Sequence, residues 1–155
     1  TDLIQFISFF GTEGTATASE LDSQDVLFFC LVEAFRQKDM LGYYFEQNDS
    51  GEYLIPSSIV AQQAKNLFGL DGFAPTDSTR YDADNDAYRY SVGSYNYALA
   101  DPKGTPDGGI AYEIDFFAPE DLNFEQPPLY TLRLSFSMAR INGMPYLQFI
   151  SKETI

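Results

Sequence analysis

Apolar side chains near the start of the chain recur at the three- and four-residue spacing of an α-helix with one buried face. Asp2 is suited to cap the amino end of this segment, and Gly11 is suited to stop it. The apolar positions between them are Leu3, Phe6, Ile7 and Phe10. This pattern predicts a short amphipathic helix. The Gly-, Thr-, Ala- and Ser-rich stretch 12–19 that follows predicts a loop.

A second helical pattern begins at Ser23, where Ser19 with Asp22, or Ser23 itself, can cap the helix. It extends to about Met40, with Gly42 just beyond its end. Its apolar positions occupy more than one face, so we expect a central helix covered on two sides. We expect Glu33 and Arg36 at the remaining wet edge.

A short hairpin and a third helix come next. Residues 43–45 and 52–55 flank the polar stretch 47–51, which has the composition of a hairpin loop. Pro56 then pre-sets a first helical turn, Ser57 or Ser58 can cap it, and Gly69 ends the helix.

Downstream of residue 87 the apolar residues recur at every second position, which is the pattern of β-strands. Alternating segments cover 88–92, 95–99 and 110–116, and the Pro- and Gly-rich stretch 101–109 predicts a loop. The glycines at 104, 108 and 109 lack the Gly-Lys-Ser/Thr ending and the following helix of a phosphate-binding loop.

Asn142-Gly143 is the preferred pair for a two-residue hairpin turn, and it sets a register for the last two strands. If Ile141 faces Met144, the apolar residues of both strands fall mostly on one face. The pairs expected farther from the turn are Met138 with Leu147, Phe136 with Phe149, and Leu134 with Ser151.

Together these patterns predict an α+β fold of one domain over 1–155, with three N-terminal helices and a small hairpin packed on a C-terminal antiparallel sheet of about four to six strands. The length and the 45% share of hydrophobic residues fit one such domain.

The charge and the residue types exclude several classes of function. A net charge of −14 repels phosphate backbones, so we expect no nucleic-acid partner. No apolar run approaches the ~20 residues of a membrane span. The chain has one cysteine, Cys30, and no histidine, which rules out an internal disulfide, Ser-His-Asp and Cys-His catalysis, and the usual zinc sites. We expect no cofactor and no bound metal.

The segment Asp82-x-Asp84-x-Asp86 begins like a calcium-binding loop, because alternate carboxylates can converge on one cation. Ala87 and Gly93 stand where that motif needs glycine and glutamate. We therefore favour a tight turn rich in Asp and Asn.

Two groups of residues are candidate ligand-binding sites. Glu113 and Asp115 project from one face of a strand, and the matching face of other strands carries Arg133 and Tyr146, together with Ser135, Ser137, Gln148 and Lys152. This set is either a carboxylate site for glycoside hydrolysis or a charge-paired sheet surface. The second group is Tyr88, Tyr90, Tyr95 and Tyr97, which could bind a glycan or peptide or could pack within the sheet.

The run Tyr53 to Ser57, the apolar positions up to Gly69, and Tyr81-Asp82 with Asn85-Asp86 and Tyr88 resemble uncharacterised extracytoplasmic domains of Gram-positive bacteria. Those domains often follow a lipoprotein signal, so the resemblance implies an extracytoplasmic location, secreted or anchored at the cell surface. The order of helices, hairpin and sheet also resembles nuclear-transport-factor-2-like and cystatin-like folds, whose curved sheet can hold a ligand against the helices.

We expect a non-catalytic extracytoplasmic domain that binds a protein, a peptide or a glycan. Tyr95, Tyr97, Glu113, Asp115, Arg133 and Tyr146 are its candidate contact residues. The alternatives are a carboxylate-dependent hydrolase acting on glycans through Glu113 and Asp115, and a purely structural module of a surface protein.

Overall fold

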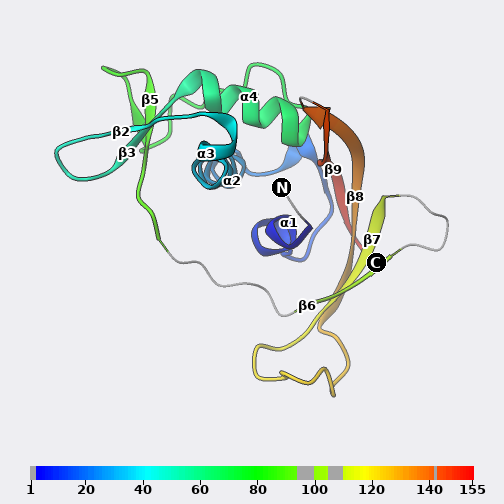
Figure 1. Cartoon of the computed structure of the whole chain (residues 1–155). Helices are drawn as coiled ribbons and strands as arrows, with labels where there is room; N and C mark the ends of the chain where they lie inside the picture. Colours follow the sequence, from blue (N-terminus) through cyan, green and yellow to red (C-terminus); the bar gives the residue numbers. More distant parts are fainter. Residues whose placement is uncertain (1–2, 94–99, 105–109, 142) are drawn as a thin grey trace. The chain divides into compact units, whose positions relative to one another are not determined.

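The computed structural model of the protein describes residues 3–93, 100–104, 110–141 and 143–155 (Figure 1). It contains helices and two antiparallel sheets, which confirms the α+β class. The chain divides into two compact units, Thr1–Glu20 with Tyr95–Ile155 and Leu21–Ser94. We call these the outer-segment unit and the middle unit and describe each by itself. One domain over 1–155 stays a prediction.

The outer-segment unit contains a five-stranded antiparallel sheet in the order β1-β9-β8-β7-β6. Its described elements are α1 (Leu3–Phe10), β1 (Ala16–Thr17), the 3₁₀ helix η1 (Ala18–Glu20), β6 (Ala100–Gly104), β7 (Ala111–Phe116), β8 (Tyr130–Ile141) and β9 (Met144–Thr154).

Helix α1 packs its apolar side on this sheet through phenylalanine rings. Phe6 lies 5.0 Å from Phe136 and 6.0 Å from Phe149 between ring centroids, and Phe10 lies 5.8 Å from Phe149. All four rings are buried, as is Leu134. The predicted inner face of the last hairpin is therefore confirmed for Leu134, Phe136 and Phe149, whereas Met138 and Met144, nearer the turn, are 53% and 58% exposed.

The register of β8 and β9 follows the turn at Gly143 only as far as the middle of the strands. Ile141 pairs with Met144, Met138 with Leu147 and Phe136 with Phe149, as predicted. Beyond them, Leu134 pairs with Lys152 rather than with Ser151. A bulge beside Ser135 and Phe136 gives β9 one extra residue at this point, which shifts every later pair by one.

Two stretches predicted as loops contain strands. Residues 100–104 form β6, whose Pro102 pairs with Ile114, and residues 16–17 form β1. Both strands lie at the edges of the sheet. An edge strand tolerates proline because one side of its backbone makes no ladder hydrogen bonds, and composition alone did not reveal this.

The middle unit contains a four-stranded antiparallel sheet in the order β2-β3-β5-β4. Its elements are α2 (Ser23–Arg36), α3 (Lys38–Leu41), β2 (Glu46–Gln47), β3 (Tyr53–Pro56), α4 (Ser57–Phe68), β4 (Tyr81–Asp82) and β5 (Ala87–Tyr90). The strand expected at 88–92 therefore pairs with β3, not with the C-terminal sheet. The structure thus has two sheets where the sequence patterns predicted one.

The helices of the middle unit match the predicted ends only in part. Gly69 ends α4 as expected, but Asp22 rather than Ser19 or Ser23 caps α2, and the N-cap residue of α4 is Pro56 rather than Ser57 or Ser58. The Asp22 carboxylate accepts hydrogen bonds from the backbone N–H groups of Gln24 and Asp25, and Gly69 ends α4 with a left-handed φ of 65°. The helix expected to reach Met40 is divided at Gln37 into α2 and α3.

Glu33 lies at the end of α2 and is fully buried, not at a wet edge as expected. Its carboxylate accepts hydrogen bonds from Arg36 at 2.9 Å and from the Gln37 side chain at 3.3 Å. A buried carboxylate needs such partners to compensate for lost hydration.

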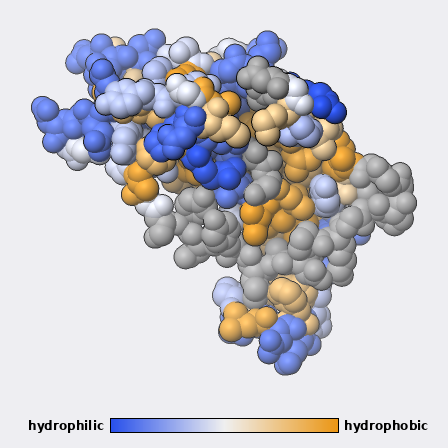
Figure 2. All heavy atoms as spheres, viewed as in Figure 1, coloured by the Kyte–Doolittle hydropathy of each residue, from blue (hydrophilic) through white to orange (hydrophobic). Residues whose placement is uncertain are grey.

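The loop 117–129 between β7 and β8 exposes apolar side chains at the lower end of Figure 2. The side chain of Leu122 is 73% exposed, while the Phe124 ring lies 4.5 Å from the Phe117 ring between centroids, tilted by 33°. In the part of the chain that the structure describes, no helix is long and apolar enough to cross a membrane.

Candidate functional site

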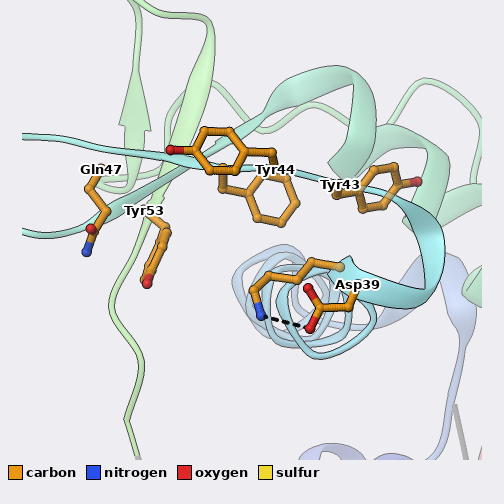
Figure 3. Close-up of a pocket in the computed structure, with 7 residues that line it drawn as sticks. Asp39, Tyr43, Tyr44, Gln47 and Tyr53 are labelled. Atoms are coloured by element: carbon orange, nitrogen blue, oxygen red, sulfur yellow. Dashed lines mark ion pairs between the residues drawn. The ribbon is translucent and has the colours of Figure 1, made fainter.

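A pocket of about 260 Å³ lies in the middle unit, between α3 and the hairpin of β2 and β3 (Figure 3). We call it the aromatic pocket. Its lining residues are Lys38, Asp39, Tyr43, Tyr44, Phe45, Gln47 and Tyr53.

Two local turns build this pocket. Gly42 adopts a left-handed conformation with φ 73° at the end of α3, and the Tyr43 N–H donates to the Lys38 carbonyl oxygen at 2.7 Å. The chain therefore reverses tightly, which places 43–45 beside the helix that it has just left. Gly42 supplies the positive φ that other residues adopt only with strain.

The hairpin on the other side of the pocket is fixed by the side chain of Asn48. Its amide oxygen accepts hydrogen bonds from the N–H groups of Ser50 at 3.0 Å and Glu52 at 2.9 Å. This is the usual role of asparagine in a turn. The turn sets the register in which Gln47 faces Tyr53, so both reach the pocket.

The rings of the pocket differ sharply in exposure. Phe45 is 5% exposed and lies 5.8 Å from the Tyr43 ring, while Tyr53 packs on Phe35 at 4.7 Å. Tyr44 is 88% exposed. In Figure 3, Tyr44, Gln47 and Tyr53 gather at one end and Tyr43 lies at the other. Packed rings thus hold the pocket in shape, and Tyr44 is the most exposed of its rings.

Two opposite charges stand at the pocket. The Lys38 Nζ lies 4.6 Å from the centroid of the Phe35 ring and 3.8 Å from the Asp39 carboxylate, an ion pair marked by the dashed line in Figure 3. The Asp39 side chain is 94% exposed and that of Lys38 is 33% exposed. The lining therefore offers aromatic faces, phenol hydroxyls, an amide, an ammonium and a carboxylate, which suits binding by stacking and polar contacts.

The structure brings together part of the predicted carboxylate set on the sheet of the outer-segment unit. Arg133 lies 2.8 Å from Glu113 and 3.9 Å from Glu153 in one cross-strand row. Asp115 accepts a hydrogen bond from the Thr131 hydroxyl at 2.6 Å. The carboxylates therefore have cross-strand partners, in the manner of a charge-paired sheet surface.

Tyr146 and Lys152 do not join this row. Tyr146 pairs with Ala139, six positions along β8 from Arg133, or about 20 Å at the usual rise of a strand. Lys152 is 8% exposed and contacts the carbonyl oxygen of Phe10 at the end of α1, because the bulge in β9 moves it to the opposite face of the sheet. The predicted place of Lys152 on the face of Arg133 is therefore wrong. Tyr146 lies on that face as predicted, because its partner Ala139 alternates with Arg133 along β8.

The predicted tyrosine group is divided. Tyr88 and Tyr90 are 0% and 4% exposed and pack in the middle unit, where Tyr90 lies 5.3 Å from Phe35. These two rings therefore belong to the core rather than to a binding surface. Tyr95 and Tyr97 lie outside the described residues.

The acidic segment 82–86 forms the turn between β4 and β5. The Asp82 carboxylate accepts hydrogen bonds from the backbone of Asp84 and Asn85 and from the Asn85 side chain. These bonds, led by the one from the Asn85 side chain, lower the pKa of Asp82. Among the residues that the structure describes, no group of three or more potential ligands could hold a metal ion.

Sequence reasoning missed the aromatic pocket because it assigned 43–45 to a strand that packs in a hairpin. A signal was present: three aromatic residues directly follow Gly42, and Tyr53 stands across a short turn from them. No protein family, curated protein or solved structure was found to match this chain.

Proposed function

We propose that the protein is a non-catalytic binding domain that takes a small group of its ligand into the aromatic pocket. The exposed ring of Tyr44 beside packed rings carries this proposal. Aromatic side chains are usually buried, and an exposed one at a pocket with a few polar groups is typical of a recognition site. Tyrosine also gives a large contact area at a low cost in conformational entropy.

Binding has better support than hydrolysis. A glycosidase needs one carboxylic acid to give a proton and a second carboxylate to act as base or nucleophile. Glu113 is paired with Arg133 and Asp115 with Thr131, and both pairs lie across neighbouring strands. Such pairing is typical of charged residues that stabilise a sheet surface. The aromatic pocket combines a cavity with an exposed ring, which is typical of a binding site.

In this proposal the ligand is a protein, a peptide or a glycan. The family resemblance of residues 53–88 supports a place of action outside the cytoplasm. Fractionation of the source cells with an antibody against this chain would test that location. Signal confined to the cytoplasmic fraction would contradict it.

The binding proposal is tested with a fluorescently labelled chain on glycan and peptide arrays. The decisive variant is Tyr44→Ala, and the control is Val92→Ala, which removes a 61% exposed side chain of the same unit outside the pocket. We expect Tyr44→Ala to abolish the strongest array signals and Val92→Ala to keep them, with equal melting temperatures. Signals that survive Tyr44→Ala would overturn the assignment of the pocket.

A further inference from the structure

The chemistry of the aromatic pocket favours a positively charged ligand group. The faces of Tyr and Phe rings carry negative electrostatic potential and attract cations within about 6 Å of the ring centroid. Asp39 adds a carboxylate to the lining. Rings with a nearby carboxylate are the composition with which proteins hold ammonium groups.

The protein already places one ammonium in this environment. The Nζ of Lys38 stands over the Phe35 ring at 4.6 Å and is paired with Asp39 at 3.8 Å. The Phe35 ring in turn packs on Tyr53, a lining residue of the pocket. Beside the pocket, a ring and a carboxylate thus hold one cation together.

Size and net charge agree with this chemistry. The pocket, at about 260 Å³, lies just below the range of about 300–1,000 Å³ that is typical for drug-sized ligands, so it suits a single head group. The net charge of −14 raises the local concentration of cations and lowers that of anions.

We propose that the aromatic pocket binds an alkylammonium group, with quaternary ammonium as the preferred form, and that Lys38 acts as its internal competitor. A quaternary ammonium is weakly hydrated and loses little on entering a site lined by rings. This proposal rests on the proposed function of the pocket and names the chemical class of its ligand. The shared group can belong to a free molecule such as choline or to a methylated lysine side chain.

The competing role of Lys38 predicts the direction in which the affinity for a cation changes when Lys38 is replaced. Its ammonium repels a second cation and engages Asp39, so its removal strengthens cation binding. Lys38→Met keeps the aliphatic stem over Phe35 and removes only the charge. We expect it to tighten choline binding by about fivefold, which is the effect of one unit charge at about 4 Å in high-dielectric surroundings. Lys38→Arg retains the charge and is the matched control.

The experiment is a titration of the whole protein with choline chloride, followed by NMR amide shifts. Trimethyllysine is titrated in parallel to separate the two sources of the group. The neutral carbon analogue of choline, 3,3-dimethyl-1-butanol, has nearly the same shape without the charge. We expect saturable shifts at residues of the pocket with choline or trimethyllysine, and binding of the neutral analogue weakened about tenfold or more.

Two further variants locate the contacts. Tyr44→Ala and Asp39→Asn are expected to weaken choline binding, because one removes an exposed ring and the other removes the carboxylate. Both side chains are mostly exposed, so the fold should be unchanged. An unaltered melting temperature checks this.

Several results would overturn the proposal. If neither choline nor trimethyllysine causes shifts at about 100 mM, the pocket has no cation site of useful affinity. Equal affinity for the neutral analogue would show an apolar site only. Weaker choline binding by Lys38→Met would show that Lys38 supports the site rather than competes for it. If the arrays still depend on Tyr44 in any of these cases, the pocket remains a binding site and only its cation specificity is wrong.

Discussion

The ammonium of Lys152 donates a hydrogen bond to the main-chain carbonyl oxygen of Thr12 at 2.9 Å, which ties the last strand to the end of the first helix across 140 positions of the chain. The same Nζ lies 3.0 Å from the Thr12 hydroxyl and 3.4 Å from the carbonyl oxygen of Phe10. The last carbonyls of a helix have no partners within the helix and favour a cation. Lys152 therefore closes α1 from outside.

Replacing Lys152 by methionine should destabilise the protein by about 1–3 kcal/mol, because the carbonyls lose their buried donor. Urea unfolding followed by circular dichroism measures this change. Lys65→Met removes a lysine that is 65% exposed and should stay within about 0.5 kcal/mol of the parent. Equal effects of the two substitutions would contradict the closing role of Lys152.

Gly11 has no room for a side chain. A Cβ atom there would stand 2.6 Å from a carbon of the Phe116 ring and closer still to the Ile7 carbonyl oxygen. Gly11→Ala should therefore cost about 1–3 kcal/mol, as overpacking usually does. At Gly93 a Cβ would meet nothing within 4 Å, so Gly93→Ala should be neutral or slightly stabilising. The melting temperatures of both variants are compared. A loss of stability only in Gly11→Ala indicates crowding at that site, and equal losses indicate a general effect of replacing glycine.

Removing the hydroxyl group of Tyr130 and that of Tyr88 should change the stability of the protein in opposite directions. The Tyr130 hydroxyl donates to the Gly11 carbonyl oxygen at 2.6 Å, whereas the fully buried Tyr88 hydroxyl has no hydrogen-bond partner among the described residues. Tyr130→Phe should cost about 0.5–1.5 kcal/mol. Tyr88→Phe should stabilise, because it removes a buried polar group whose burial costs about 1–3 kcal/mol. Loss of stability in Tyr88→Phe would show that the hydroxyl has a partner.

Burial raises the pKa of Tyr88 to about 12. Because the unfolded value is about 10, the unfolded state loses the Tyr88 proton first, and the free energy of unfolding falls as the pH rises from about 10 toward 12. Between about pH 8 and pH 11, the free energy of unfolding should thus fall less in Tyr88→Phe than in the parent. Identical falls would place the alkaline sensitivity elsewhere.

The ion pair of Glu113 and Arg133 should contribute little to stability. Their side chains are 43% and 42% exposed, and pairs of this kind couple by about 0.2–1 kcal/mol. A double-mutant cycle with Glu113→Gln and Arg133→Met measures the coupling. The same Glu113→Gln protein serves the test of hydrolysis, since turnover of a glycan substrate that depends on Glu113 would favour the enzyme alternative.

Local chemistry in the sequence determined the helix ends and one turn. Gly11 ends α1, Gly69 ends α4 and Gly143 closes the last hairpin, all as predicted, while Pro56 precedes α4 as its N-cap residue. These features depend on neighbouring residues alone: a cap needs one side chain, and a positive φ needs glycine. The alternation of apolar residues then placed Phe136 and Phe149 on the buried face.

The tertiary structure decided the features that join distant segments. The extra residue in β9 places Lys152 against α1, and the sequence near residue 150 does not predict that contact. The pairing of β5 with β3 and the place of Tyr44 and Tyr53 at one pocket likewise join separate stretches. Such contacts are chosen by the total packing and hydrogen bonding of the folded chain. A periodic pattern fixes which face of an element is buried, but it does not fix the partner of that face.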